Sequence, residues 1–160
     1  LFTRAGLRVP PWHLIQTKYR LLSDRTIVDI QRSKLPVVVK PTTCGSSVGV
    51  TIVKRKQYLS RAIRHAFRYA PSVIIQQFIK GKEVTCGVIE KSGKLLALPP
   101  TEIVPKGSPF FDYRAKYAKG GSDEITPARI SRVETRMVQR AALAAHAAIG
   151  ASGYSRSDFI

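Results

Sequence analysis

The sequence predicts an α+β protein made of two small α+β units, and three observations lead to that prediction. Short β-branched runs bounded by turn residues indicate strands, and two amphipathic stretches indicate helices. A Lys-Gly-Lys-Glu segment at residues 80–83 separates two groups of such elements. A chain of 160 residues can bury one sizeable core or two small ones, so we expect units at residues 1–81 and 82–160.

The first half predicts a hairpin followed by a helix. Residues 5–12 are punctuated by Gly and Pro and predict an extended loop, and a short helix after Thr17 is only weakly indicated. Leu35–Lys40 and Val48–Val53 flank a Gly/Ser loop and predict a β-hairpin. Apolar residues recur at helical spacing over Lys56–Tyr69. The arginines expected on its solvated face are Arg61, Arg64 and Arg68.

The rest of the chain predicts a strand that ends the first unit, and then a hairpin, a long connection, a helix and a final strand. Residues 72–79 read as a strand, and residues 83–100 as a hairpin that turns at Ser92 and Gly93. Thr101–Pro127 shows no clear period, and connections of this length are usually functional. A helix is expected over Ser131–Ile149, followed by a strand from Tyr154. Its expected apolar face comprises Val133, Met137, Val138, Ala141 and Ala145.

Composition narrows the classes of function. The chain is 44% hydrophobic, but its apolar stretches are too short to span a membrane and no signal sequence opens it, so we expect a cytoplasmic protein that is not in a membrane. Cys44 and Cys86 lie far apart without metal-binding spacing, which favours reduced thiols. Because residue 1 is not Met and the chain stops in a strand-like pattern, we expect a piece of a longer protein.

The net charge of +17 makes polyanions candidate partners. These include nucleic acid, a membrane surface and a phosphate-bearing small molecule. The basic residues are spread along the chain without a block of five, which weakens the nucleic-acid hypothesis without removing it.

The segment Val-Val-Val-Lys-Pro-Thr-Thr-Cys-Gly-Ser-Ser-Val-Gly-Val, residues 37–50, places a lysine at the end of a strand and a small-residue loop after it. Lys40 can meet an anion from a fixed backbone, and the loop can close over the anion with N–H groups left open by Gly45, Ser46, Ser47 and Gly49. In the Walker A loop the lysine follows the glycines, so this is a different arrangement. The alternative is an ordinary hairpin without a ligand.

Tyr-Ser-Arg-Ser-Asp-Phe-Ile, residues 154–160, has the alternation of a strand. Arg156 and Asp158 then point to the same face, about 7 Å apart along the strand. An arginine can stabilise an oxyanion, and an aspartate beside it can hold a divalent cation. The alternative is a solvent-facing edge with a weak ion pair.

The long connection contains Phe-Phe-Asp-Tyr-Arg-Ala-Lys-Tyr, residues 110–117, in which aromatic residues alternate with Arg114 and Lys116. Such a segment can stack on nucleic acid or form a lid that carries a cation over phosphates. Glu83 follows a glycine and can accept hydrogen bonds from ribose hydroxyls, although an exposed turn glutamate is the commoner case. The histidines are isolated, and we expect no chemical role for His13, His65 and His146.

Four segments, at residues 35–50, 73–89, 110–117 and 154–160, resemble D-alanine:D-alanine ligases of the ATP-grasp superfamily in their order and spacing. The resemblance extends over nearly the whole chain. It implies an ATP-grasp fold with two α+β subdomains that sandwich the nucleotide, truncated at both ends. It also implies an ATP-dependent ligase that joins two D-alanines through an acyl phosphate for peptidoglycan precursor synthesis.

The resemblance assigns roles residue by residue. Lys40 and Lys116 contact phosphates, the Gly45–Gly49 loop covers them, and Glu83 takes the ribose hydroxyls. The whole implied nucleotide set is Lys40, Gly45, Ser46, Ser47, Gln76, Gln77, Phe78, Ile79, Glu83 and Lys116. The implied catalytic residues are Arg156, Ser46 and Tyr117, and the implied magnesium ligand is Asp158.

The implied cofactors are ATP and Mg²⁺ (or Mn²⁺), and the implied substrate is D-alanine, in a cytoplasmic homodimer without nucleic acid. Other hypotheses are a D-alanine:D-lactate ligase or related enzyme, a copy without catalysis, and a basic nucleic-acid module. The family usually has a glutamate at Cys44 and charged residues at Gln76 and Gln77, so loop anchoring and base contact are in doubt. Further metal ligands would lie after Ile160, so the isolated piece is expected to bind magnesium poorly and not to turn over.

Overall fold

A computed structural model of the chain describes residues 1–16, 34–106 and 121–160. These residues divide into two compact units: the first unit is the described part of Pro10–Ile79, and the second unit combines Leu1–Val9 with the described residues from Lys80 to Ile160. The expected units at 1–81 and 82–160 stay a prediction. The expected helix after Thr17 and the segment at 110–117 lie outside the described residues.

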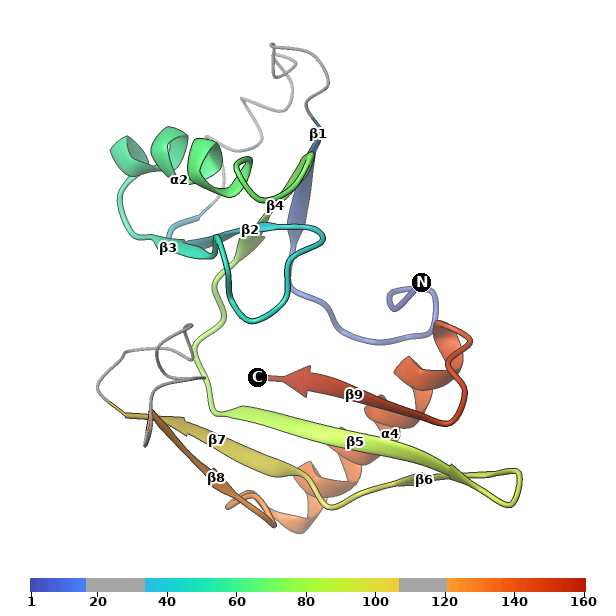
Figure 1. Cartoon of the computed structure of the whole chain (residues 1–160). Coiled ribbons are helices and arrows are strands. Elements are labelled where there is room, and N and C mark those ends of the chain that lie inside the picture. Colours follow the sequence, from blue (N-terminus) through green and yellow to red (C-terminus); the bar gives the residue numbers. More distant parts are fainter. Residues whose placement is uncertain (17–33, 107–120) are drawn as a thin grey trace. The chain divides into compact units, whose positions relative to one another are not determined.

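The first unit is built on an antiparallel four-stranded sheet in the order β1-β4-β2-β3 (Figure 1). Its strands are β1 (Trp12–Gln16), β2 (Val37–Pro41), β3 (Thr51–Val53) and β4 (Ser72–Gln77). Strand β2 pairs with β3 from Val37 opposite Val53 to Val39 opposite Thr51, which confirms the predicted hairpin. Side chains alternate along β2, so Val37 and Val39 are buried and Lys40 lies on the other face, half-buried.

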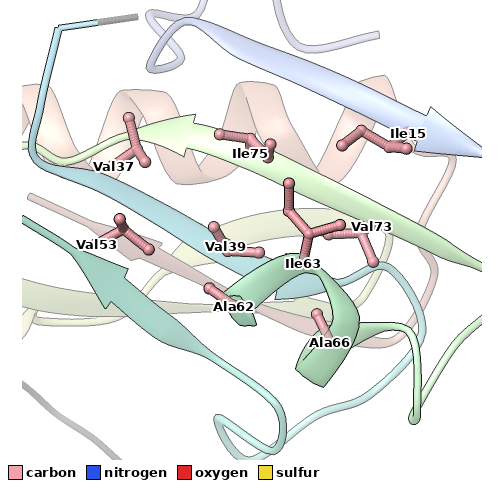
Figure 2. Close-up of a cluster of buried hydrophobic side chains, with 9 residues drawn as sticks. All are labelled: Ile15, Val37, Val39, Val53, Ala62, Ile63, Ala66, Val73 and Ile75. Carbon is pink, nitrogen blue, oxygen red and sulfur yellow. The ribbon is translucent and has the colours of Figure 1, made fainter. Parts of the chain in front are cut away.

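The core of the first unit lies between this sheet and helix α2 (Leu59–Ala66), which follows a single 3₁₀ turn, η1 (Lys56–Tyr58). Figure 2 shows side chains from all four strands and from the helix in contact; they are Ile15, Val37, Val39, Val53, Ala62, Ile63, Ala66, Val73 and Ile75. The arginines of α2 and of the turn after it, Arg61, Arg64 and Arg68, are exposed. The amphipathic pattern of this segment is therefore confirmed.

Several boundaries in the first unit differ from the sequence-based prediction. Strand β1 was not predicted, since the expected loop ended at Trp12 and the residues after it gave no clear pattern. Its residues pair with β4 from Trp12 opposite Gln76 to Gln16 opposite Ser72. Strand β3 begins at Thr51 instead of Val48, because a turn occupies the residues before it. The helix ends at Ala66, and Pro71 soon afterwards cannot continue a helix.

The second unit contains a five-stranded antiparallel sheet, in which the order β6-β5-β7-β8 is joined by β9 pairing with β5 (Figure 1). Its strands are β5 (Glu83–Lys91), β6 (Lys94–Ala97), β7 (Thr101–Pro105), β8 (Ser122–Ile125) and β9 (Tyr154–Phe159). The turn between β5 and β6 has φ of 51° at Ser92 and 72° at Gly93. Positive φ at both central residues suits the twist of a tight hairpin, so the predicted turn is confirmed.

Helix α4 (Arg132–Ala148) lies against β5, β6 and β9. Ser131 caps its first turn in a capping box with Glu134, and Gly150, with φ of 63°, follows its end. The predicted apolar face is wrong at two positions, because Val133 is 67% exposed and Met137 is 62% exposed. Alanines lie on several sides of this helix, so more than one line of residues along it has the apolar spacing of a buried face. The buried stripe comprises Ala142, Ala145 and His146.

The connection at Thr101–Pro127 has strands at both ends, which corrects the expectation of a segment without regular structure. Strand β7 pairs with β8 from Glu102 opposite Ile125 to Pro105 opposite Ser122. Both β7 and β8 contain polar residues and do not alternate between apolar and polar residues, so no strand pattern is visible in the sequence here. No helix in the described part of the chain is long and apolar enough to cross a membrane.

Candidate functional site

Lys40 and the loop at residues 42–50 form the first of two candidate groups, all within the first unit. Strand β2 fixes the backbone of Lys40 through antiparallel pairing, with Lys40 opposite Ile74 of β4. Burial lowers the pKa of the Lys40 ammonium, because water is partly withdrawn from the charged form. An anion bound at this position would restore a partner for that charge, so the residue is suited to hold a phosphate.

Three residues of the loop have left-handed backbone conformations, which are unfavourable for residues with side chains. Ser46 and Ser47 have φ of 58° and 59°, and Gly49 has φ of 71°. The Val48 N–H donates to the Gly45 carbonyl at 3.2 Å, which closes a tight turn around the two serines. Non-glycine residues in this region cost about 1–3 kcal/mol each and are found mainly at functional sites. Successive N–H groups in such turns form anion-binding concavities.

The segment predicted to border adenine, Gln76–Ile79, uses several of its polar groups within the first unit. The Gln77 N–H donates to the Pro11 carbonyl at 2.9 Å, and the Phe78 N–H donates to the Pro36 carbonyl at 3.1 Å. The Gln77 side-chain amide also donates to Pro36, at 3.1 Å. The strand ends at Gln77, where its partner β2 begins at Val37. The side chain of Gln77 therefore fixes the end of β4 against the segment before β2.

Arg156 and Asp158 form the second candidate group, which lies within the second unit. Arg156 Nε lies 3.2 Å from Asp158 Oδ1, which confirms that the two side chains share one face of β9. Thr85 Oγ1 on the neighbouring strand β5 donates to the same Asp158 oxygen at 2.9 Å. Both side chains are more than half exposed, at 68% and 57%. The pair is therefore oriented by the sheet and accessible to a ligand.

The other face of β9 carries a contact that the sequence did not predict. His146 of α4 is 1% exposed, and its Nδ1 lies 2.8 Å from Ser155 Oγ on β9. Within the described residues its Nε2 has no hydrogen-bond partner. The expectation that His146 has no chemical role is not changed by this contact, which ties the helix to the strand that carries Arg156. The sequence held two signals for the contact between His146 and Ser155, which were the alternation of β9 and the position of His146 on a helix.

An ion pair between a buried carboxylate and an exposed arginine, near the start of α4, was also missed. Glu102 of β7 is 5% exposed and accepts hydrogen bonds from Arg129 Nε at 2.9 Å and from Arg129 Nη2 at 3.0 Å. Hydrogen bonds from Arg129 hold the pKa of the Glu102 carboxyl below its usual range and raise the pKa of Arg129. The Lys82 ammonium lies 3.9 Å from Glu102 Oε1. These residues are far apart in sequence, so no local pattern could join them.

Glu83 is the first residue of β5, opposite Ile103 of β7, and is half-buried. Its backbone is therefore in a strand, and the alternative of an exposed turn glutamate does not describe it. Lys116 and Tyr117 lie outside the described residues. The structure thus groups Lys40 with its loop, and Arg156 with Asp158.

A divalent cation needs several oxygen ligands. In residues 1–16, 34–106 and 121–160 there is no group of three acidic, His or Cys side chains that could hold a metal ion. The Asp158 carboxylate is accessible, and it contacts the positively charged Arg156 as well as Thr85. Asp158 therefore fits the role of one magnesium ligand, but the described residues do not form a complete magnesium site.

The fold places the chain in the ATP-grasp class of proteins. It has two antiparallel sheets, each with a helix on one face, and a Gly/Ser loop that follows a lysine at the end of a strand. The family model described as "D-ala D-ala ligase C-terminus" matches residues 1–160, and the chain belongs to this family.

Curated relatives agree with this family. The D-alanine--D-alanine ligase of Leptospira interrogans serovar copenhageni is 43% identical over 165 residues, which is 100% of this chain and 47% of the relative. That of Geotalea uraniireducens is also 43% identical, over 99% of this chain and 48% of its own length. The chain therefore spans about half the length of the curated relatives it matches.

Solved structures support the fold. The VanG D-Ala:D-Ser ligase from Enterococcus faecalis has a TM-score of 0.82 at 34% identity, covering 98% of this chain and 45% of that protein. The D-alanine--D-alanine ligase from Bacillus anthracis has a TM-score of 0.74 at 33% identity, covering 98% of this chain and 48% of that protein. The predicted ATP-grasp fold is confirmed.

Proposed function

We propose that the protein carrying this chain is an ATP-dependent ligase that joins two D-alanines for peptidoglycan precursor synthesis. The proposal is supported by relatives of this name that align with the whole chain at 43% identity. The single structural observation that carries it is the ordered pair Arg156 and Asp158 on one accessible face of β9. The two side chains suit an oxyanion and a cation, which a carboxylate-activating ligase must handle together.

In this proposal the nucleotide is ATP. Lys40 contacts its phosphates, and the Gly45–Gly49 loop covers them with backbone N–H groups. The left-handed turn at Ser46 and Ser47 supports this assignment, because it presents successive N–H groups to an anion. Gln76–Ile79 borders adenine, Glu83 accepts from the ribose hydroxyls, and Lys116 supplies a second cation to the phosphates.

The first step transfers the γ-phosphoryl group of ATP to the carboxylate of one D-alanine. The bond between the β-bridging oxygen and the γ-phosphorus breaks, a carboxylate oxygen bonds to phosphorus, and ADP leaves. Negative charge shifts onto the bridging oxygen of ADP, and Lys40 and Lys116 offset the charge of the phosphates. The product is an acyl phosphate, whose carbonyl is far more electrophilic than a carboxylate.

In the second step the amine of another D-alanine attacks that carbonyl. The tetrahedral intermediate carries an oxyanion, and Arg156 donates to it; one such donor is worth roughly 3–4 kcal/mol in comparable sites. Inorganic phosphate then leaves and the amine loses a proton, which yields the dipeptide. Ser46 and Tyr117 act in closing the site, which excludes water that would hydrolyse the acyl phosphate.

Asp158 supplies one oxygen ligand to a magnesium (or manganese) ion. When bound, such an ion neutralises phosphate charge in phosphoryl transfer. Thr85 orients the Asp158 carboxylate through the 2.9 Å hydrogen bond to Oδ1. Asp158 is a single ligand, and the described residues hold no group of three that could complete the site, so we expect the 160-residue chain alone to bind the ion weakly and not to turn over.

The test uses the full-length protein that contains this chain, expected to be a cytoplasmic homodimer. Release of ADP and phosphate should require D-alanine, and Lys116→Ala and Arg156→Ala should each lower turnover sharply. Arg61→Ala on the exposed face of α2 is the matched control and should leave turnover unchanged. No D-alanine-dependent release by the wild type would favour a copy without catalysis, and normal turnover in both site variants would refute the assigned roles.

A second candidate keeps the chemistry and changes the second substrate. It is favoured by the structural similarity to the D-Ala:D-Ser ligase from Enterococcus faecalis, with a TM-score of 0.82. D-Serine, D-lactate and D-alanine should be offered in competition to the acyl phosphate formed from D-alanine. A product dominated by D-alanyl-D-alanine supports the first candidate, and a dominant ester or D-serine product replaces it.

A further inference from the structure

The phosphate loop, residues 42–50, touches one short segment of the first unit at its beginning, middle and end. That segment is the α2–β4 connection, residues 67–71, together with the first residue of β4, Ser72. At the beginning of the loop, the Thr42 N–H donates to the Ser72 carbonyl at 3.2 Å, and Thr42 Oγ1 lies 2.6 Å from Ser72 Oγ. These bonds fix the point at which the chain leaves β2.

The middle of the loop is held by Cys44. Its Sγ donates to the carbonyl oxygen of Tyr69 at 3.2 Å. This carbonyl follows the end of α2, where backbone acceptors lack helical partners. The bond needs a side-chain donor at position 44, which the Cys44 thiol supplies.

The end of the loop packs against the ring of Tyr69. A methyl group placed on Gly49 would lie 2.7 Å from Cδ2 of Tyr69 and 2.8 Å from Cγ of Pro41. Contacts this short do not occur between real atoms of side chains, so the backbone approaches the Tyr69 ring as closely as a glycine allows. The positive φ of Gly49, 71°, also favours glycine here.

Tyr69 is itself held in place by the end of the helix. Its N–H donates to the Ala66 carbonyl at 3.0 Å. Its ring meets the His65 ring edge to face, with 5.3 Å between centroids and 74° between planes. His65 Nδ1 is in turn hydrogen-bonded to Arg68 Nη2. The Tyr69 ring is therefore a fixed surface, even though 42% of the residue is exposed.

The loop needs such external support, because its own conformation is strained. Left-handed serines persist only where surrounding contacts over-determine them, and Ser46 and Ser47 lie between the Cys44 and Gly49 contacts. We propose that the α2–β4 connection holds the phosphate loop in its anion-binding conformation, with Tyr69 as the positioning residue. This inference rests on the proposed function, since it takes ATP phosphates as the ligand of the loop.

The test compares ATP with AMP in the full-length protein. Tyr69→Ala removes the ring that supports the loop, so the Kd for ATP should rise about tenfold, as expected for a misplaced binding group. The Kd for AMP should change less than about twofold, because AMP lacks the β- and γ-phosphates that the loop covers. Tyr69→Phe keeps the ring and should behave as the wild type. Tyr58→Ala is the matched control, because Tyr58 is 49% exposed before the other end of α2.

A purely structural role gives a different pattern. If Tyr69→Ala weakens ATP and AMP equally with a fall in Tm, or leaves ATP binding unchanged, the inference is wrong. Should Tyr69→Ala fail to fold, Cys44→Ala must weaken ATP selectively and Cys44→Ser must restore it, and equal affinities in these two variants overturn the inference. A wild type that binds no ATP refutes the proposed function instead, so the two failures are distinguishable.

Discussion

Arg156 and Asp158 hold each other in place on β9, with 3.2 Å between Arg156 Nε and Asp158 Oδ1. The contact leaves most of the guanidinium accessible, since 68% of the arginine side chain is exposed. An exposed pair of this kind contributes at most about 1 kcal/mol to folding. Its orientation therefore matters more for a ligand than for the stability of the sheet.

The first prediction concerns Arg156 in the full-length protein. Arg156→Ala should lower kcat about 100- to 1000-fold, because one oxyanion donor is lost, while the free energy of unfolding changes by less than about 1 kcal/mol. Arg156→Lys keeps the charge and loses the planar fork, so it should rescue only part of kcat. Steady-state kinetics and denaturant unfolding measure the two quantities.

The control for this prediction is Arg132→Ala, which removes another exposed arginine of the second unit. It should leave kcat unchanged. A fall in stability that accounts for the lost activity of Arg156→Ala would contradict the proposed role.

The second prediction concerns the pH dependence of ATP binding. Burial lowers the pKa of the Lys40 ammonium in the folded chain, whereas a bound phosphate favours the charged form and raises it. ATP binding should therefore take up protons at alkaline pH, and ATP affinity should fall as the pH rises through the lowered pKa. Calorimetry in two buffers of different ionisation enthalpy measures this uptake.

Lys40→Met should remove both the proton uptake and the alkaline loss of affinity. Lys54→Met, at an exposed lysine of the same unit, should retain both. Equal pH profiles for the wild type and Lys40→Met would show that Lys40 does not contact the phosphates.

The third prediction concerns acid stability and the buried carboxylate of Glu102, which pairs with the exposed Arg129. The pKa of Glu102 is lowered in the folded chain by hydrogen bonds from Arg129, so at acid pH the unfolded chain binds more protons. The stability from this pair is complete above the ordinary pKa of a glutamate, about 4.3, and is lost as the pH falls through the lowered folded value. Glu102→Gln should lower Tm at neutral pH and make Tm less dependent on acid pH.

Glu124→Gln is the matched control for this prediction. Glu124 is a glutamate of β8 whose side chain is exposed. A carboxylate surrounded by water contributes little to stability. A Tm profile of Glu102→Gln that parallels that of Glu124→Gln would contradict the importance of the buried Glu102 carboxylate.

The fourth prediction concerns His146 and Ser155. Ser155→Ala removes the hydroxyl that lies 2.8 Å from the buried Nδ1, so the free energy of unfolding should fall by about 1–3 kcal/mol. In a His146→Phe background the same substitution should cost less, because no buried nitrogen is left without its partner. Ser152→Ala, at an exposed serine before β9, should have almost no effect. Additive losses in the double variant would contradict the coupling.

The local parts of the fold could be predicted from the sequence, because they depend on turn chemistry and alternation. The β5–β6 turn needs Ser92 and Gly93 at positive φ, and the two-residue period of β9 puts Arg156 beside Asp158. Strand β1 and the buried carboxylate of Glu102 could not be predicted in this way. The partners of β1 in β4 are 56 to 64 residues away, and Arg129 is 27 residues from Glu102, so a window along the chain does not contain them.

Cys44 shows the same limit within the candidate site. From the sequence it was only a departure from the family pattern, because its partner is the carbonyl of Tyr69, 25 residues later. The face of α4 was misjudged for a different reason, since an alanine-rich helix offers several apolar stripes and only the sheet selects one.

The alternation of β9 also means that heat tolerance and chemistry can be adjusted separately along six residues. Even-numbered positions carry the exposed Arg156 and Asp158, which are the proposed site residues, whereas Ser155 faces the helix. A protein engineer could therefore strengthen the odd-numbered side of this strand against α4 without touching the reacting groups. Variants of this strand could therefore differ in thermal stability while Arg156 and Asp158 stay the same.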